Sequence, residues 1–556
     1  MQIVTEGFAS VAALLVLVGV LGAVALLLRQ PLVVAFLVAG ILGGPAALGL
    51  VRHGDELEVF AELGIAILLF LVGLKLDIGI IRQMGAVALL AGLVQVAFTA
   101  GVGLLLAQLQ GWSWSASAYI ALALSFSSTI IIVKLLSDRR DIDSLHGRLA
   151  VGILIIQDIV VILALLLLPA LDPGEGGQAG LPQVAGQVGL MLVKAVLAGG
   201  ALAAATRWMI PKVAHHLARS TELLLLASIA WAVGLAASAD VLGFSKEVGA
   251  FVAGVSLAST PFREAIGNRL VPLRDFLLVF FFIELGAGLE LDRLAGVLLP
   301  AIALSLFVLV GKPIVIMAIL GVLGYHKRTG FFAGLTLGQI SEFSLILGAL
   351  GVSLGHLPEE GLALLTLVAL ITIACSTYGI VNLAWLYDKL ASVLGIFERD
   401  HPTREFSDTA ITPLRVDVIL IGLGRYGGRI GRQLSARGLS VYAVDFDPGA
   451  IKRWTSEGRH GRYGDATDPE LCSTLPLSQA RLVVCSAPDL RTNRALLDAL
   501  HKAGYDGEFA ATAHNHREAR ELRRLGADLV LEPFTNAADE AADRLEPLAA
   551  READGP

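Results

Sequence analysis

Residues 152–168 read GILIIQDIVVILALLLL, a run of hydrocarbon side chains that contains one carboxylic acid, Asp158, and one amide, Gln157. The run belongs to an apolar window at 149–171, long enough to cross the ~30 Å hydrocarbon core of a bilayer as a helix. An ionised carboxylate near the middle of such a helix costs several kcal/mol, so it must face a polar cavity, pair with a cation or hold a proton. A proton and an arriving metal cation can then compete for Asp158, which predicts an exchange site.

The composition places the chain among polytopic membrane proteins. It has 556 residues, a mean hydropathy of +0.74 and only 16% charged residues, and a soluble protein of this size does not have that composition. Windows of about 20 apolar residues recur over the first two-thirds of the chain. We count thirteen, at 8–28, 31–50, 58–76, 85–108, 114–136, 149–171, 187–209, 221–238, 246–259, 272–290, 296–323, 330–351 and 361–385.

Loop charge predicts the orientation in a bacterial cytoplasmic membrane. Arg and Lys gather in alternate loops, whereas the opposite loops contain only Arg52 and Arg293. Positive loops stay in the cytoplasm, so we expect the N-terminus outside and the C-terminal third inside. The three cysteines suggest no disulfide framework, and no basic stripe suggests nucleic acid.

An internal repeat links the two halves of the membrane part. Residues 70–77 (FLVGLKLD) and 285–292 (LGAGLELD) align at an offset of 215, and the same offset places the polar run 125–129 on 340–344. Two interrupted spans at corresponding places are the signature of inverted-repeat transporters, whose discontinuous helices cross near the midplane. The alternative is that these Ser and Thr residues bond back to their own helices and serve packing.

The other polar groups of the spans leave several roles open. Because Gln157 contributes dipoles and not a second charge, the simplest stoichiometry is one proton for one monovalent cation without net charge movement. Glu342 is either an ion ligand or a charge that neutralises a half-helix N-terminus. Glu284 is either an auxiliary acid or the partner of Lys312 in an ion pair.

These segments together resemble the cation:proton antiporter-2 superfamily, and within it the Kef-type potassium efflux systems. The resemblance rests on ALALSFSSTIII (121–132), LIIQDIVVI (154–162), LRDFLLVFFFIELGAGLEL (273–291) and GQISEFSLIL (338–347). It implies a homodimer of thirteen-helix subunits in which a core domain moves against a dimer domain, and Asp158 as the carrier of cation and proton. Gln157 is placed with Asp158 in the exchange centre, and the candidate ion-binding residues are Ser125, Ser127, Ser128, Thr129, Gln339, Ser341 and Glu342. Glu284 departs from the Kef pattern, where a small apolar residue is expected.

A nucleotide-binding pattern follows the membrane part. VDVILIGLGRYGGRIGRQLSARGLSVYAVDFDP (416–448) predicts a strand, a glycine turn, a helix and a second strand. Gly422, Gly424 and Gly427 form G-x-G-x-x-G in this context, and Asp445 ends the second strand where it would bond a ribose hydroxyl. Further strands are expected within 461–470, 481–489, 507–515 and 527–533.

The motif GDATD (464–468) resembles the nucleotide domain that regulates potassium conductance, also called the RCK or KTN domain. The resemblance implies that Asp465 and Thr467 contact the nucleoside. Arg425 either meets a phosphate or is a solvated loop residue. The effector would be AMP, ATP/ADP or NAD(H), since the basic residue expected for a glutathione site is absent from 511–516. An ancillary cytoplasmic regulator is a further partner of such systems.

We therefore expect an α-helical polytopic exchanger with inverted repeats at 1–388, a linker at 389–415, a Rossmann domain at 416–535 and a tail at 536–556. The favoured function is nucleotide-regulated K⁺/H⁺ antiport, not an enzyme activity. Na⁺/H⁺ antiport on the same scaffold stays open, because the cation is set by cavity size. A potassium channel is a third reading, but no filter sequence like TVGYG is present. A nucleotide sensor with a membrane anchor is a fourth, although an anchor needs no mid-membrane acid.

Overall fold

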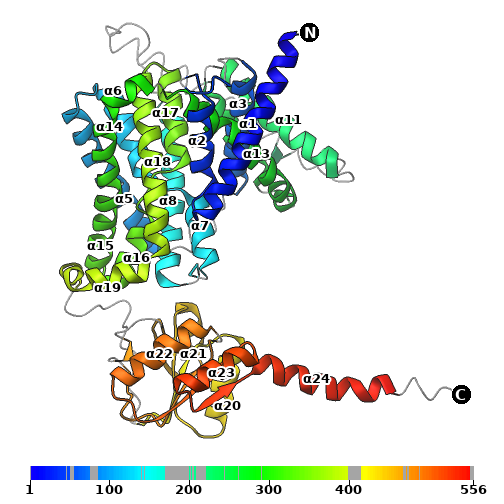
Figure 1. Ribbon diagram of the computed structural model, residues 1–556, viewed down its shortest axis with the longest axis vertical. Helices are drawn as coiled ribbons and strands as arrows, with labels where there is room; N and C mark the ends of the chain where they lie inside the picture. Colours follow the sequence, from blue (N-terminus) through cyan, green and yellow to red (C-terminus); the bar gives the residue numbers. More distant parts are fainter. Residues whose placement is uncertain are drawn as a thin grey trace, which may run out of the picture. The chain divides into compact units, whose positions relative to one another are not determined.

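A computed structural model shows two compact units, which we treat separately (Figure 1). The first consists of residues 1–138, 149–320 and 330–397, and the second of residues 139–148, 321–329 and 398–556. The structure describes residues 2–45, 47–50, 55–75, 85–139, 141–142, 144–168, 194, 200, 202, 206–207, 221–242, 244–258, 260, 262–289, 291–398, 415–466, 471–472, 475–487 and 489–550. The predicted span at 187–209, most of the linker, Asp77 and Thr467 thus lie largely or wholly outside the described residues.

One group of helices in the first unit packs around α3 and α13. These two helices lie along each other, and α12 lies along α3, α2 along α13, α1 along α2 and α11 along α12. Leu and Phe side chains such as Phe70, Leu74 and Leu270 fill the space between α3, α11, α12 and α13. The bounds are α1 (Gln2–Leu27), α2 (Leu32–Gly43), α3 (Asp55–Lys75), α11 (Thr221–Val241), α12 (Lys246–Ala258) and α13 (Arg263–Ala287).

Glycines bring the backbones of this group into direct contact. A Cβ on Gly254 of α12 would overlap the carbonyl oxygen of Phe70, and one on Gly73 of α3 would overlap that of Phe251. Gly40 of α2 and Gly286 of α13 face each other in the same way. Small residues allow this close approach where there is no hydrophobic drive between helices. The group therefore has interfaces with no room for a side chain.

A second group of helices contains both interrupted spans. The helix α6 packs against α5 and α17, and α18 packs against α14 and α17. The bounds are α5 (Gly85–Leu109), α6 (Trp114–Ser125), α7 (Thr129–Asp138), α8 (Leu145–Leu167), α14 (Leu291–Leu306), α15 (Lys312–Val322), α16 (Lys327–Thr336), α17 (Glu342–Ser353) and α18 (Glu359–Val381). A π-helical turn at Phe307–Gly311 joins α14 to α15, and such turns are frequent at functional sites.

Seven helices in the described residues are long and apolar enough to cross a membrane, and three shorter apolar helices accompany them. The helical architecture expected from the sequence is confirmed, and the count of thirteen spans stays a prediction. The segment expected to be a polar linker begins as helix, because α19 (Leu383–Leu394) continues into a 3₁₀ turn at Gly395–Phe397. Its apolar residues Leu383, Tyr387 and Leu394 are buried, so this stretch packs as part of the first unit.

The second unit contains a six-stranded, fully parallel sheet in the order β3-β2-β1-β4-β5-β6. This is the doubly wound order of a Rossmann fold, so the predicted domain is confirmed (Figure 1). The strands are β1 (Val418–Ile421), β2 (Val441–Asp445), β3 (His460–Tyr463), β4 (Leu482–Cys485), β5 (Glu508–Thr512) and β6 (Leu529–Leu531). The helices are α20 (Arg425–Ala436), α21 (Pro448–Ser456), α22 (Leu490–Lys502), α23 (His516–Leu525) and α24 (Pro533–Ala550).

The strands β1, β2 and β4 at the middle of this sheet are short and mostly apolar, as expected for a parallel sheet that is covered on both faces. Every residue of β1 and β2 is buried. The cysteines Cys375, Cys472 and Cys485 are all free, as expected from the sequence. Burial raises the pKa of the Cys485 thiol to about 12, so this side chain is a core residue and not a reactive thiol.

The contact between α3 and α12 generates a stability prediction. We expect Gly254→Ala to lower the unfolding free energy by about 1–3 kcal/mol, because the methyl group forces the two backbones apart. Gly234→Ala in α11 is the control, since a Cβ there meets nothing within 4 Å. Thermal unfolding of the detergent-purified proteins measures both changes. Equal midpoints for the two variants would contradict the tight α3–α12 contact.

Candidate functional site

Both predicted interruptions are present, but only the first lies where the sequence indicated. The first occupies Phe126 to Ser128, between α6 and α7, as the sequence indicated. The second occupies Leu337 to Ser341, between α16 and α17. An offset of 215 had placed it at 340–344, and residues 342–344 are helical instead. Each half of the membrane part thus contains an interrupted span, as predicted. The offset between the two interruptions is a few residues smaller than 215.

The proposed equivalence of Gly73 and Gly288 has less support. Gly73 lies inside α3 at the contact with α12, whereas Gly288 is the residue after α13, where its N–H donates to the carbonyl of Glu284. Asp77 and the side chain of Asp292 lie outside the described residues. The sequence match at 70–77 and 285–292 thus does not correspond to one shared structural role for its glycines.

The two interrupted spans touch each other directly. The Ser127 hydroxyl donates to the carbonyl oxygen of Leu337 (2.9 Å), and the Ser344 hydroxyl donates to that of Ala123 (2.6 Å). Both serines are fully buried. These side chains satisfy carbonyl groups of the other span, which a broken helix would otherwise leave unpaired. The polar residues are needed because the backbone is interrupted inside an apolar environment.

Lys312 lies between the two interruptions. Its ammonium group donates to the Phe126 carbonyl (3.1 Å), the Ser127 hydroxyl (2.9 Å) and the Gln339 carbonyl (3.0 Å), and the side chain is fully buried. The three N–H donors of the ammonium are thus matched by three oxygens. The predicted Lys312–Glu284 ion pair is wrong. The residue follows the π-helical turn and reaches the carbonyl ends of α6 and α16, where a positive charge is stabilised.

Asp158 is half-buried on α8 and faces the start of α7. The Thr129 hydroxyl donates to its Oδ2 atom (2.9 Å), and Thr129 is the first residue of α7. The N-terminus of a helix is its positive end, so a carboxylate is stabilised there. In the described part of the chain this hydroxyl is the one hydrogen-bond donor recorded for the Asp158 carboxylate.

Gln157 does not face the start of α7 as Asp158 does, and its amide makes other hydrogen bonds. Its Oε1 accepts from the backbone N–H of Ser127 (2.8 Å), and its Nε2 donates to Oε1 of Gln95 (2.6 Å). Gln95 in turn donates to the Ser125 carbonyl (3.2 Å) and to Thr99 (3.0 Å). Both ends of the amide are therefore used to hold the first interruption. Sequence reasoning missed Gln95, although an amide at the middle of an apolar span was a usable signal.

The remaining serines of the first interruption bond to nearby backbone. Ser125 donates to Ala121 (3.0 Å) and lies 3.5 Å from the carbonyl of Val96, and Ser128 accepts from the N–H of Ile131 (3.4 Å). The packing alternative stated for these residues thus describes Ser125 and Ser128. Thr129 is different because its hydroxyl points to the acid.

The second interruption brings Gln339, Ser341 and Glu342 together. Ser341 caps α17 by accepting from the N–H of Phe343 (3.1 Å), and its own N–H donates to Ser344 (3.2 Å). Oε1 of Gln339 accepts from Ser376 (2.7 Å). Glu342 is 6% exposed, and its Oε1 atom has no hydrogen-bond partner. A buried carboxylate with an unpaired oxygen is costly, and its position at the start of α17 offsets part of that cost.

Glu284 is half-buried on α13, away from the interruptions. The groups whose charges act on it most are Glu58 and Glu62 of α3, and Glu62 is paired with Lys246 of α12 (2.7 Å). The first helix group therefore has an acidic region of its own, partly balanced by one lysine. Among the described residues, no hydrogen bond or ion pair joins Glu284 to Asp158.

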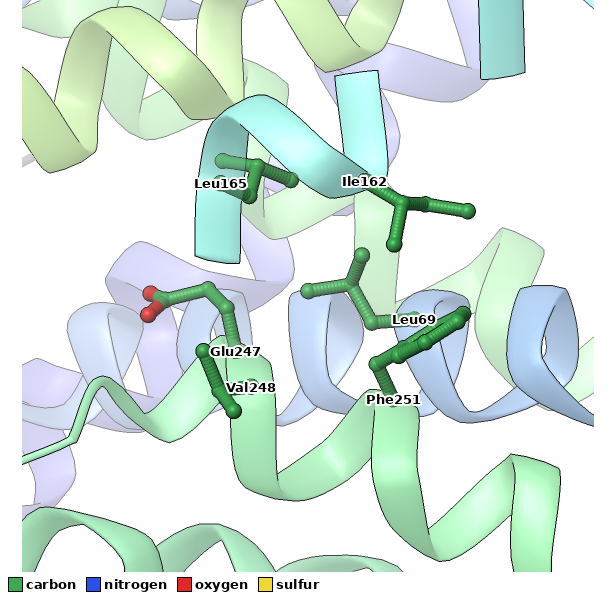
Figure 2. Close-up of a pocket in the computed structure, with 6 residues that line it drawn as sticks. All are labelled: Leu69, Ile162, Leu165, Glu247, Val248 and Phe251. Atoms are coloured by element: carbon green, nitrogen blue, oxygen red, sulfur yellow. The ribbon is translucent and has the colours of Figure 1, made fainter. Parts of the chain in front are cut away.

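A small pocket lies along α8, next to the candidate site (Figure 2). It is lined by Ile162 and Leu165 of α8, Leu69 of α3, and Glu247, Val248 and Phe251 of α12. Residues spaced by four and three lie on one face of a helix, so Asp158, Ile162 and Leu165 share a face of α8. The pocket thus continues the face that bears the acid, and the Glu247 carboxylate is the charged group in its wall.

The glycine turn of the second unit fits a nucleotide phosphate. Gly422 has a φ of +95°, and a Cβ on Gly427 would overlap the carbonyl of Gly422. Gly424 precedes α20, and a Cβ there would meet nothing within 4 Å. Space at the middle glycine and a helix N-terminus without a side-chain cap are what a phosphate requires. Arg425 is exposed at the first position of α20, beside this space.

Asp445 and Asp465 end neighbouring strands of the sheet. The Asp445 carboxylate accepts from the backbone N–H groups of Leu423 and Asp447. Burial raises the pKa of Asp445, and these hydrogen bonds oppose the shift. Asp465 follows β3 and accepts from Nη1 of Arg328 (2.8 Å). Both acids lie where expected, at the carboxyl edge of the sheet, and Thr467 lies outside the described residues.

The chain thus contains two interrupted apolar spans in contact with each other and, in its second unit, a Rossmann domain. Residues 12–384 match the transmembrane sodium/hydrogen exchanger family, and residues 418–533 match the TrkA-N domain. The first match covers more than half of the chain, so the chain belongs to the sodium/hydrogen exchanger family. The Kef-type family with a C-terminal RCK N-lobe, expected from the sequence, is confirmed by this combination and by the relatives.

Three relatives show the extent of the similarity. The chain is 28% identical over 525 residues to "Putative cation/proton antiporter YbaL" of Escherichia coli, covering 93% of each protein. It is 31% identical over 389 residues to "Iron transporter MagA" of Paramagnetospirillum magneticum, covering 69% of this chain and 87% of that protein. It is 27% identical over 503 residues to "Putative K(+) efflux antiporter KefB" of Alkalimonas amylolytica, covering 90% of this chain and 75% of that protein.

Lys312 gives the prediction for this site. In Lys312→Met the three oxygens lose their donor, and each unpaired buried group costs about 1–3 kcal/mol. We expect a lower thermal unfolding midpoint and loss of ion exchange in proteoliposomes. Lys134→Met is the matched control, because Lys134 is exposed on α7. A Lys312→Met protein as stable and active as the wild type would contradict the bridging role.

Proposed function

We propose that the chain exchanges a monovalent cation for H⁺ across the membrane by alternating access to Asp158. The favoured cation is K⁺. The observation that carries this proposal is the half-buried Asp158 carboxylate at the start of α7, held by one hydroxyl group at 2.9 Å. A carboxylate with lone pairs to spare can take either a proton or a metal cation. Thr129 is the first further ligand, and Ser127, Ser128, Gln339 and Ser341 shape the surroundings through the two interruptions.

The formal charges of the site support a one-for-one exchange. Lys312 contributes one positive charge and Glu342 one negative charge, on opposite ends of the half-helices. Asp158 then remains as the charge that a proton or a monovalent cation neutralises equally. Gln157 adds no charge because its amide is committed to Ser127 and Gln95.

Potassium is favoured over sodium by the relatives and not by the site geometry. One relative is named for K⁺ efflux, and one for iron transport. The ligands at Asp158 are oxygen atoms, which suit hard monovalent cations. Na⁺ exchange on the same residues is the second candidate.

The setting is a multi-pass membrane protein. We propose a homodimer in a bacterial cytoplasmic membrane, with the N-terminus outside and the TrkA-N domain in the cytoplasm, as the loop charges indicate. The open space at Gly424 supports binding of an adenine nucleotide, AMP, ADP, ATP or NAD(H), whose phosphate would meet α20. Nucleotide binding would then regulate exchange, with or without an ancillary cytoplasmic protein.

The central test is proton flux in proteoliposomes that contain a pH dye, with K⁺, Na⁺ or Li⁺ added in turn. We expect cation-dependent flux in the wild type and its loss, by at least about 100-fold, in Asp158→Asn, because an amide cannot hold an exchangeable proton. Thr129→Val should retain flux with a weaker apparent cation affinity. Glu284→Gln is the matched control and should behave as the wild type.

Flux that survives in Asp158→Asn and disappears in Glu342→Gln would move the carrier role to Glu342. Loss of flux in Glu284→Gln would support the alternative that Glu284 is an auxiliary acid. Absence of flux with every cation, with and without nucleotide, would favour the channel or sensor readings.

A second test addresses the stoichiometry. Exchange of one proton for one monovalent cation moves no net charge. We therefore expect the proton flux driven by Na⁺ to be the same with and without valinomycin, which clamps the membrane potential. Solid-supported membrane recordings should show no turnover current. A sustained current that depends on Asp158 would contradict one-for-one exchange.

A further inference from the structure

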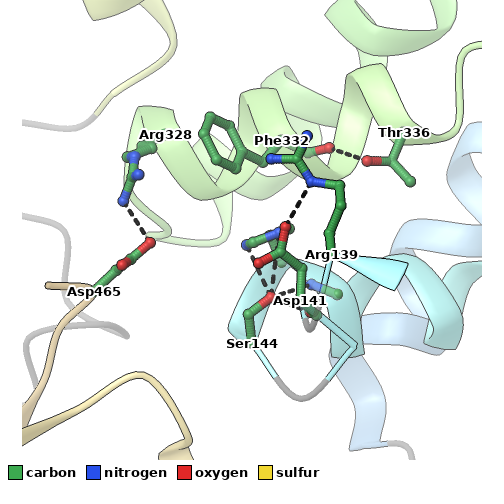
Figure 3. A network of polar contacts seen from close by, with 9 residues as sticks. Arg139, Asp141, Ser144, Arg328, Phe332, Thr336 and Asp465 are labelled. Carbon is green, nitrogen blue, oxygen red and sulfur yellow. Dashed lines mark hydrogen bonds and ion pairs between the residues drawn. The ribbon is translucent and has the colours of Figure 1, made fainter. Parts of the chain in front are cut away.

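Two arginines from short segments of the second unit pair with acids of its nucleotide fold. Segments 139–148 and 321–329 belong to this unit together with the sheet. Arg328 pairs with Asp465 (2.8 Å) and Arg148 pairs with Asp447 (3.0 Å). Figure 3 shows the Arg328–Asp465 contact, and beside it the first segment, in which Arg139 pairs with Asp141 (3.0 Å).

Both acids lie at the edge of the sheet where a nucleotide would bind. Asp447 caps α21 directly after β2, and Asp465 follows β3. Parallel strands place their carboxyl ends along one edge, and ligands of doubly wound sheets bind outside that edge. The two arginines thus pair with acids at the same edge as the glycine turn and Asp445.

The two pairs differ in how well water reaches them. The Arg328 side chain is 10% exposed and that of Asp465 is 30% exposed, against 54% and 29% for Arg148 and Asp447. A shielded pair is strongly coupled, because loss of one partner leaves the other charge poorly solvated. An exposed pair is weak. Arg328 is therefore the arginine whose release has a measurable cost.

We propose that Arg328 competes with an adenine nucleotide for Asp465, so that the nucleotide binds with release of this arginine. The proposal rests on the nucleotide binding proposed above. Asp465 stands at the edge of the sheet outside which ligands of doubly wound folds bind, and its Oδ2 atom accepts a hydrogen bond from the Arg328 guanidinium. The ligand must displace the guanidinium to use that oxygen.

The chain connects this competition to the ion site. Arg328 lies in the first turn of α16, the helix that ends at the second interruption, and Arg148 lies in the first turns of α8, ten residues before Asp158. A ligand that is favoured by one arrangement of a segment changes the population of that arrangement, and the effect is reciprocal. Release of Arg328 is thus a means by which nucleotide binding changes the arrangement of α16, and through it the second interruption with Gln339 and Glu342.

The test is ADP binding to the full-length protein in detergent, measured by titration calorimetry. We expect Arg328→Gln to bind ADP roughly 5- to 100-fold more tightly than the wild type, the range of typical coupling between sites. Arg328→Lys, which keeps the charge, should stay close to the wild type. Arg139→Gln is the matched control, because its pair lies within the first segment, and it should leave ADP affinity unchanged.

A double-mutant cycle separates competition from a general effect of charge. In an Asp465→Asn background, Arg328→Gln should no longer tighten ADP binding, because the carboxylate for which the arginine and the nucleotide compete is gone. Equal or weaker ADP binding by Arg328→Gln in the wild-type background would overturn the proposal. ADP binding by none of the proteins would overturn it together with the proposed nucleotide regulation.

Transport gives an independent measurement. Wild-type proton flux should change on addition of ADP to the side of the TrkA-N domain, and the flux of Arg328→Gln should respond at correspondingly lower ADP concentrations. Failure of antiport itself would abolish flux in every variant while the binding cycle still reports on Arg328. A wild-type and an Arg328→Gln protein with the same ADP dose–response would overturn the competition.

Discussion

The ammonium group of Lys312 is the contact on which the membrane part of the structure depends. Interrupting two helices inside an apolar medium leaves carbonyl groups without partners, and no water is available there to bond them. One side chain supplies three donors to oxygens from both interruptions. Removing the lysine would leave two broken spans facing each other with unpaired negative ends. A buried positive charge therefore stabilises the interrupted backbone of both spans.

The ends of the half-helices follow one electrostatic rule. The carbonyl ends of α6 and α16 face the lysine, whereas the N-termini of α7 and α17 face or bear the carboxylates Asp158 and Glu342. Each charge lies at the helix end of opposite sign. This arrangement stabilises two acids and a base in a small volume without pairing them directly.

Much of this architecture could be predicted from the sequence, and the exceptions have physical causes. The acid in a run of hydrocarbon, the two polar interruptions and the G-x-G-x-x-G turn are all local patterns, and each is found, although the second interruption begins before the predicted run and ends inside it. The partners of Lys312 were missed because backbone carbonyls leave no trace in a sequence. Gln157 was placed in the exchange centre because it is the neighbour of Asp158 in the sequence. Only the fold shows that helical geometry turns it toward Gln95 and Ser127.

The backbone contacts made through Gly73, Gly254, Gly40 and Gly286 have a consequence for measuring motion. Four helices, α2, α3, α12 and α13, are locked in pairs in which carbonyl oxygens lie against glycines. Such interfaces cannot slide by rotamer changes, since they contain no side chains at the point of contact. These helices thus form an internal frame of reference. Spin labels placed within the frame should keep constant separations, and a label pair from the frame to α8 would show whether the helix that bears Asp158 moves.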